Sequence, residues 1–189
     1  MRNFKSGIDV RITSYRNERI KMLNDMVRNF LWDDEAINQY VIGEFIIMND
    51  QYMPYGSKPL AYNGQTFKIK KITKDIVEFI ECYILTVSKD IDLIVPTEKG
   101  MPHYKKRISQ LKHEAIESKS WNNYRDFKCQ FADISYGYAV TNYRIQGSTV
   151  TGCYVDLSDI LSVGPLSNKR KLQAFYVGIS RPTDFLAIF

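Results

Sequence analysis

The sequence predicts an α/β domain that is interrupted by a small antiparallel β-barrel. A strand pattern followed at once by a helix pattern opens the chain, short strand patterns with Gly and Pro turns fill its middle, and mixed helix and strand patterns return after them. The 189 residues are 44% hydrophobic, which is enough for one sizeable core or for one core and a small satellite domain.

The chain opens with the pattern of an α/β unit. Residues 8–15 alternate apolar or β-branched side chains with polar ones, as a half-buried strand does. Residues 17–32 then place apolar side chains at helical spacing, so they predict an amphipathic helix. A strand that leads directly into a helix is typical of α/β folds.

The middle of the chain predicts short strands that are joined by turns. These strands are predicted at 44–49, 66–73, 77–87 and 92–96. Residues 53–59 are rich in Pro and Gly, and Asn63-Gly64 is a strong hairpin turn signal. We therefore expect a small antiparallel barrel over about 43–96.

Helix and strand patterns alternate again in the last part of the chain. Helices are predicted at 103–118, 122–134 and 169–180, and strands at 137–140, 151–157 and 185–189. The first two of these helices and the link between them form the most basic part of the chain. We assign 1–42 to the first part of the α/β domain, 43–100 to the barrel, and 101–189 to a basic helical return segment and the remainder of the α/β domain.

Charge and cysteine content narrow the possible partners and location. The net charge is +5 and the pI is near 9.0, which suits a nucleic-acid partner but does not establish one. Cys82, Cys129 and Cys153 lie far apart and show no metal or disulfide spacing, so we expect reduced thiols in a cytoplasmic protein and no metal site. No apolar run approaches the length of a membrane span.

The strongest functional pattern runs from Tyr138 to Thr149. An apolar strand ends in Thr141, and polar or glycine positions crowd the residues that follow. Ligands bind at the carboxyl ends of strands in open α/β sheets, and Gly147 would let the backbone approach a phosphate closely. From the residues alone, an ordinary polar loop explains the pattern equally well.

A second pattern, Ala174–Pro182, is a largely apolar helix that ends in Arg181. An arginine fixed at the end of a packed helix could act on the γ-phosphate of a nucleotide. The competing interpretation is a cation that interacts favourably with the dipole at a helix C-terminus.

Together the two patterns resemble motifs V and VI of superfamily 1B helicases, most closely the Dda-like phage helicases related to the RecD group. Ile12–Asn17 and the residues after them resemble motif IV of that family. Gly43–Met48 and Asn63–Gln65 resemble parts of the family's inserted barrel, which has a Src-homology-3-like (SH3-like) fold. Trp121–Phe131 resembles the segment that leads back into the motor domain.

The resemblance implies a RecA-like (P-loop NTPase-type) second motor domain, called 2A, with the SH3-like barrel, called 2B, inserted in it. It implies a catalytic contact between Arg181 and the γ-phosphate, and nucleotide binding by Gln146, Gly147, Ser148 and Arg181. It implies DNA binding by Thr141, Asn142, Tyr143 and Arg144. Tyr143 replaces the histidine that is usual in the family, and Arg144 replaces the usual lysine.

The sequence contains no P-loop pattern Gly-x-x-x-x-Gly-Lys-Ser/Thr, and Asp33-Asp34-Glu35 follows a helix pattern rather than a buried strand. We therefore expect no ATP hydrolysis by this chain alone, and ATP with Mg²⁺ only together with a missing N-terminal RecA-like domain.

The chain would be a monomeric piece of a longer helicase, or a free-standing remnant that needs a partner chain. The implied partner is single-stranded DNA, in a bacterial or phage-infected cell. The alternatives are a free-standing, non-catalytic nucleic-acid-binding module and a structural or protein–protein module.

Overall fold

The structure is a computed structural model that describes residues 9–54, 56, 58–164 and 166–189. It divides the chain into two compact units. Of the described residues, 9–36 and 136–189 form the first unit, and Ile37–Ser135 form the second. Residue 8 of the first predicted strand, and residues 55 and 57 of the predicted turn, lie outside the described residues.

The first unit is built on a four-stranded parallel sheet with the strand order β7-β1-β8-β9. Its strands are β1 (Val10–Ser14), β7 (Ala139–Thr141), β8 (Val150–Val155) and β9 (Pro182–Ile188). Ile12 of β1 lies beside Ala139 on one side and Tyr154 on the other. Every residue of β1 is buried, as expected for a central strand of a parallel sheet.

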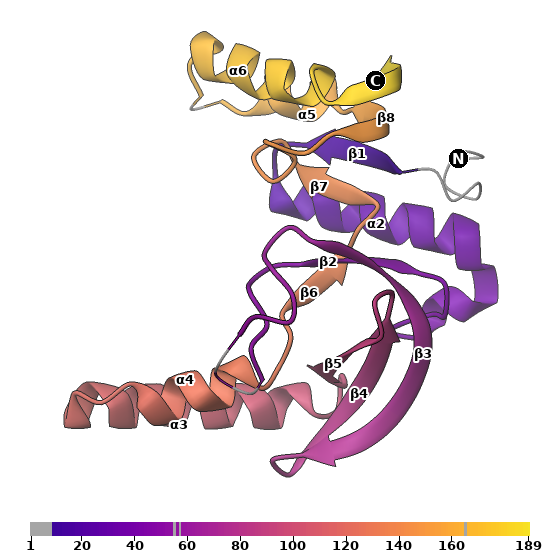
Figure 1. Cartoon of the computed structure of the whole chain (residues 1–189). Coiled ribbons are helices and arrows are strands. Elements are labelled where there is room, and N and C mark those ends of the chain that lie inside the picture. The colour runs from indigo at the N-terminus through magenta and orange to yellow at the C-terminus, as the bar shows by residue number, and fades with distance from the viewer. Residues whose placement is uncertain (1–8, 55, 57, 165) are drawn as a thin grey trace. The chain divides into compact units, whose positions relative to one another are not determined.

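Three α-helices belong to this unit: α2 (Asn17–Trp32), α5 (Leu157–Ser162) and α6 (Asn168–Ile179). Figure 1 shows the strands lying between α2 and α6. The Asn24 side chain fastens α2 to the sheet, because its amide donates to the Ala139 carbonyl at 3.0 Å and its oxygen accepts from the Ala139 N–H at 2.9 Å. A short 3₁₀ helix, η1 (Asp33–Ile37), follows α2 and contains the acidic run.

Gly178 sets how closely α6 approaches the sheet. A Cβ atom at this position would lie 3.0 Å from Thr13 Oγ1 and 3.1 Å from Val155 Cγ2. Both neighbours are fully buried, so neither can move aside easily. The glycine therefore allows close packing of the helix that ends just before Arg181.

We expect Gly178→Val to lower the free energy of unfolding by about 1–3 kcal/mol, because the larger side chain overpacks the space between α6 and the sheet. Urea denaturation followed by circular dichroism measures this change. The matched control is Gly164→Val, since an added Cβ at Gly164 meets no atom within 4 Å. Equal stability of the two variants would show that α6 tolerates the larger side chain.

The second unit is built on a five-stranded sheet with the order β5-β4-β3-β2-β6. Its strands are β2 (Phe45–Met48), β3 (Thr66–Val77), β4 (Ile80–Val87), β5 (Ile91–Pro96) and β6 (Ile134–Tyr136). The β2–β3, β3–β4 and β4–β5 pairs are antiparallel. The N–H of Ala132, just before β6, donates to the Ile94 carbonyl of β5 at 2.8 Å, so a hydrogen bond joins regions at opposite ends of the strand order.

Two helices pack on this sheet: α3 (Met101–Ser118) and α4 (Asn122–Cys129). Buried Leu111 of α3 and Phe127 of α4 form one cluster with Ile80 and Cys82 of β4. This cluster explains why residues 101–135, which the sequence assigned to the return segment, are part of the second compact unit. A separate core between the strands contains Ile46, Phe67, Leu85 and Leu93, among others.

The mixed α/β class, with one parallel and one antiparallel sheet, is confirmed. The helix predicted at 17–32 is also confirmed. The helix predicted at 122–134 is wrong beyond Cys129, because Phe131 and Ala132 are buried against the sheet and the chain continues into β6. The sequence analysis also missed α5, and it placed a break within β3, whose turn into β4 lies at Glu78-Phe79.

Candidate functional site

The loop after β7 runs from the carboxyl ends of the parallel strands to their amino ends. It leaves the carboxyl end of β7 at Thr141 and reaches the amino end of β8 at Val150. Its first part is a tight turn, in which the N–H groups of Arg144 and Ile145 both donate to the Thr141 carbonyl, at 2.9 and 3.2 Å. The predicted DNA-binding residues and all the predicted nucleotide-binding residues except Arg181 therefore lie on this loop or at the end of β7 that leads into it.

Gly147 allows this loop to turn toward β8. Its φ angle is +85°, a left-handed backbone conformation that residues with a Cβ atom rarely adopt. An added Cβ would meet no atom within 4 Å, so the backbone conformation rather than space favours glycine here. The flanking residues Gln146, Ser148 and Thr149 are exposed.

Arg181 lies at the amino ends of the parallel strands, whereas Thr141 lies at their carboxyl ends. Its carbonyl accepts from the N–H of Val150 at 3.2 Å, which places it beside the start of β8. Its Nε donates to the Val177 carbonyl at 3.2 Å, and its Nη2 donates to Ser180 Oγ at 3.0 Å. The end of α6 thus fixes the guanidinium through its own last turn.

A pocket of about 420 Å³ brings the two sequence patterns together. It is lined by Asn142, Tyr143, Gln146, Gln173, Ala174, Tyr176, Val177 and Arg181. Four of the predicted site residues line it, whereas Thr141, Arg144, Gly147 and Ser148 are not among its lining residues. Gln173 and Tyr176 were not predicted as site residues, although their spacing of three residues places them on one face of α6.

Asn142 is the most buried polar residue of this pocket, at 1% exposure. Its Nδ2 donates to the Ala174 carbonyl at 2.9 Å, and its backbone N–H donates to the Ser14 carbonyl at 3.0 Å. Its Oδ1 is buried and has no hydrogen-bond partner among the described residues. A buried acceptor without a partner is costly, so Oδ1 is a natural place for a donor from a bound molecule or water.

Tyr143 pairs with Tyr15, which follows β1, near the carboxyl edge of the sheet. Their hydroxyl oxygens lie 3.4 Å apart, and their ring centroids lie 5.8 Å apart at an interplanar angle of 64°. The hydrogen bond with Tyr143 raises the pKa of Tyr15, so this hydroxyl stays protonated. Tyr15 belongs to the segment that resembles motif IV, but no site role was predicted for it, because its partner stands 128 residues further along the chain.

Asp159 of α5 holds the chain segment that carries Tyr15. Its Oδ2 accepts from Ser14 Oγ at 2.6 Å and from the N–H groups of Tyr15 and Arg16, each at 2.9 Å. Its Oδ1 accepts from Arg16 Nε at 2.5 Å. Burial by itself would raise the pKa of Asp159, but these hydrogen bonds outweigh it and the pKa lies below its ordinary value.

Within the described part of the chain, no group of three or more His, Cys, Asp or Glu side chains is arranged to hold a metal ion. None of the described helices combines the length and the apolar character needed to cross a membrane.

No protein-family model matches the sequence. A curated relative, the uncharacterized protein R530 of Acanthamoeba polyphaga mimivirus, is 24% identical over 232 aligned residues, which cover 93% of this chain and 46% of R530.

Solved structures resemble the fold more clearly. The crystal structure of the Pif1 helicase from Candida albicans matches with a TM-score of 0.53 and 11% identity, over 97% of this chain and 45% of the helicase. The Pif1 helicase from Bacteroides, solved in complex with ADP-AlF3 and ssDNA, matches with a TM-score of 0.51 and 11% identity, over 96% of this chain and 40% of the helicase.

The fold of this chain is therefore similar to that of part of the Pif1 helicases. It spans less than half the length of the mimivirus relative and of both Pif1 helicases. At these identities, the likeness to Pif1 helicases concerns the fold alone.

Proposed function

We propose that this chain is the C-terminal motor region of an ATP-dependent DNA helicase of the Dda-like, RecD-related group. In this proposal the parallel-sheet unit is the RecA-like domain 2A, and the five-stranded sheet of the other unit is the SH3-like barrel 2B. The observation that carries the proposal is the pocket in which Gln146 of the first motif and Arg181 of the second face the same space.

The proposed nucleotide side is the part of the pocket next to Arg181. A guanidinium held by Val177 and Ser180 needs little reorganisation to meet the charge that develops on a transferred phosphoryl group. Gln146, Gly147 and Ser148 would contact the same nucleotide from the adjoining loop. The P-loop and the magnesium ligands would come from a RecA-like domain in the same polypeptide or in a partner chain, since this sequence contains no P-loop.

The proposed DNA side lies at the other end of the same loop. Thr141 would hold a backbone phosphate, with Asn142 and Arg144 beside it, and Tyr143 would stack on a base. The pair of Tyr15 and Tyr143 offers two aromatic rings where the family usually supplies a histidine. One loop would therefore contact DNA near the carboxyl ends of the strands and nucleotide near their amino ends. Such a loop is a physical route for coupling hydrolysis to translocation and unwinding.

We expect the chain to bind a single-stranded oligonucleotide with an affinity that falls as salt rises. Tyr143→Ala should weaken this binding about tenfold, because loss of one stacked base costs about 1–3 kcal/mol. Fluorescence anisotropy of a labelled oligonucleotide at several salt concentrations measures both effects.

The matched control is Tyr62→Ala, because Tyr62 and Tyr143 have the same exposed fraction of 59% and Tyr62 lies in the other unit. Equal losses of DNA affinity in the two variants would show that Tyr143 makes no specific contact with DNA. A chain that does not bind DNA even at low salt would leave the protein–protein module as the better reading.

A further inference from the structure

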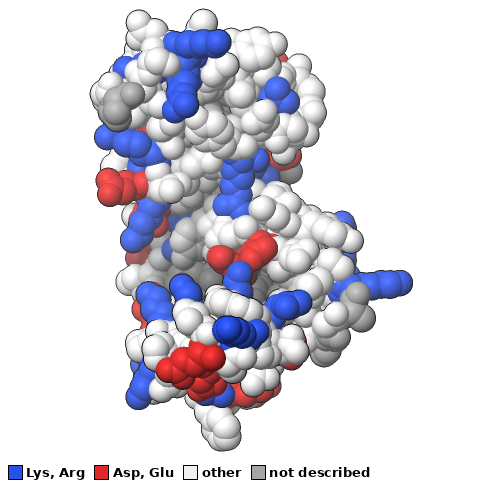
Figure 2. Space-filling view, turned by 90° about the vertical axis from the view of Figure 1, so that its left-hand side faces the viewer, with Lys and Arg blue, Asp and Glu red and all other residues white. Residues whose placement is uncertain are grey.

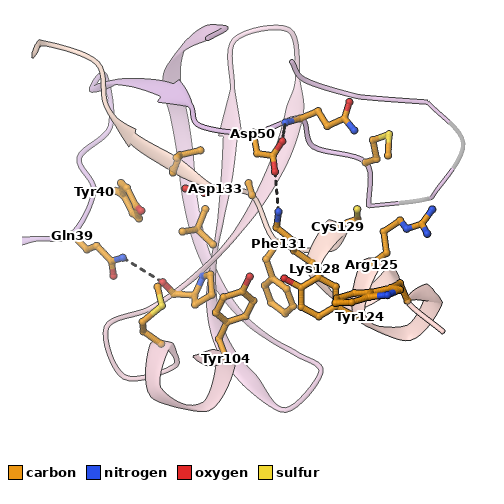
Figure 3. A pocket seen from close by; sticks show the side chains of 18 residues that line it. Gln39, Tyr40, Asp50, Tyr104, Tyr124, Arg125, Lys128, Cys129, Phe131 and Asp133 are labelled. Atoms are coloured by element: carbon orange, nitrogen blue, oxygen red, sulfur yellow. Dashed lines mark hydrogen bonds and ion pairs between the residues drawn. The ribbon is translucent and has the colours of Figure 1, made fainter. Parts of the chain in front are cut away.

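A second pocket, of about 540 Å³, lies entirely within the unit formed by Ile37–Ser135. It lies between the start of α3, one face of α4, the end of β5 and the segment after β2 (Figure 3). Its volume falls in the range of about 300–1,000 Å³ that is usual for sites of small ligands. None of the residues with a role in the proposed motor site lines it.

One wall of this pocket is aromatic and is fixed in place. The Tyr104 ring stacks on buried Phe127, with centroids 5.8 Å apart and planes 18° apart, and meets buried Phe131 edge-on at 5.0 Å. Trp121 meets Tyr124 edge-on at 5.5 Å and is 42% exposed. Figure 3 shows Tyr104, Phe131 and Tyr124 along the wall formed by the helices. Such a wall favours a flat, aromatic ligand.

The charged side chains that line the pocket balance, and with the amides they suit hydrogen bonding to a neutral ring: the carboxylates are Asp50 and Asp133, the cations Arg125 and Lys128, and the amides Gln39 and Gln51. Lys128 Nζ and Asp50 Oδ2 form an ion pair at 2.9 Å across the pocket, so their charges largely cancel. Burial raises the pKa of Tyr104, so its hydroxyl remains a donor at neutral pH. Arg125 is exposed beside them and has no ion-pair partner among the residues that the structure describes.

The segment that contains α3 and α4, both of which contribute to the pocket, carries an excess of positive charge. From Met101 to Lys128 the sequence has seven Lys and Arg residues and three Asp and Glu residues, a net charge of +4 against +5 for the whole chain. Figure 2 shows Lys and Arg side chains spread over the face that it draws, with Asp and Glu side chains among them. Positive charge around an aromatic pocket favours a flexible polyanion that carries flat rings.

We propose that this pocket takes one unstacked base of a single-stranded nucleic acid, while the adjoining phosphates lie on Arg125 and the basic surface of α3 and α4. The base stacks against the aromatic wall near Trp121 and Tyr124. The proposal rests on the single-stranded DNA partner proposed above and adds a second contact to it, in the unit that does not contain the motor pocket. A peptide partner fits the aromatic wall but does not explain the excess of positive charge.

The test uses Trp121 as its own reporter in the full chain. The sequence has one other tryptophan, Trp32, so Trp32→Phe leaves Trp121 as the sole indole. Titration with a thymidine 15-mer should quench its fluorescence, and a 15-mer of abasic sites, which keeps the phosphates, should not. Trp121→Ala should weaken binding of the thymidine 15-mer about tenfold. Trp121→Phe should keep most of the affinity.

Two matched controls separate stacking and charge from general effects. Phe79→Ala removes a fully exposed aromatic of the same unit outside the pocket, and it should leave affinity unchanged. Arg125→Gln should weaken binding more than Arg107→Gln, which removes an exposed arginine of α3 that does not line the pocket. A photocrosslink from 4-thiothymidine in the unaltered chain should map to Trp121 or Tyr124, so the test does not depend on any variant folding.

The outcomes distinguish this inference from the function on which it rests. If the chain binds DNA but neither quenching nor crosslinking reaches the pocket, the second contact is wrong and the motor-site contact stands. Equal binding of abasic and thymidine oligomers would also overturn the base contact. Absence of any DNA binding at low salt overturns both proposals. Quenching of Trp121 by a peptide partner in its place would assign the pocket to protein binding.

Discussion

Replacing Arg181 with alanine should lower DNA-stimulated ATP hydrolysis about a thousandfold once this chain is combined with a P-loop motor domain, since arginine fingers contribute about 10³–10⁵ in rate. The reason is electrostatic. Arg181 is held by the last turn of α6 beside the loop that contains Gly147, so its charge is already in position. Alanine provides no positive charge to stabilise the negative charge on the transferred phosphoryl group.

The measurement is steady-state ATPase activity with and without single-stranded DNA, using the chain fused to the P-loop domain. Lys169→Ala is a matched control, because Lys169 is an exposed cation of the same helix that does not line the pocket. Arg181→Lys should recover only part of the rate, since an ammonium cannot fork onto two oxygens as a guanidinium can. Full ATPase activity of the Arg181→Ala variant in the fusion would show that Arg181 has no catalytic role.

The parts of the site that follow sequence order could be predicted from the sequence. Thr141 ends an apolar strand pattern and Arg181 ends an apolar helix pattern, so each could be placed at an element boundary before its surroundings were known. The loop from Asn142 to Thr149 is rich in polar residues and contains one glycine, and Gly147 does have a positive φ.

The parts that depend on contacts across the sheet could not be predicted in this way. Tyr15 gains its partner Tyr143 only because β1 and β7 are neighbours in the sheet. Asp159 belongs to a helix of six residues, which is too short to show a helical period, and its hydrogen-bond donors stand some 145 residues earlier.

The misplaced end of α4 has a related cause. Phe127 and Phe131 are four residues apart, which is helical spacing, and both are buried in the same cluster. The helix nevertheless ends at Cys129, and Phe131 reaches the cluster from the segment that leads into β6. Periodicity indicates which side chains share a core, but it does not fix the conformation that brings them there.

Asp159→Ala should lower the free energy of unfolding by about 3 kcal/mol, because it leaves buried donors of the segment after β1 without an acceptor. The carboxylate is almost fully buried and accepts hydrogen bonds from Ser14, Tyr15 and Arg16. Asp159→Asn should cost less, because it keeps one of the two acceptor oxygens, although it loses the charge and the other acceptor. Urea denaturation at neutral pH measures both variants, with Asp25→Asn on the exposed side of α2 as the control.

The pH dependence separates the charge of Asp159 from its packing. Its pKa is lowered in the folded chain, so its carboxylate contributes stability that is fully present above the ordinary aspartate pKa of about 3.9 and is lost as the pH falls through the lower folded value. The stability gap between the natural chain and Asp159→Asn should therefore be constant from about pH 5 to 8 and narrow below about pH 4. A gap that does not change with pH would mean that Asp159 acts through shape and hydrogen bonding alone. Closure of the gap on acidification would instead identify a buried charge as what holds Tyr15 in position next to Tyr143.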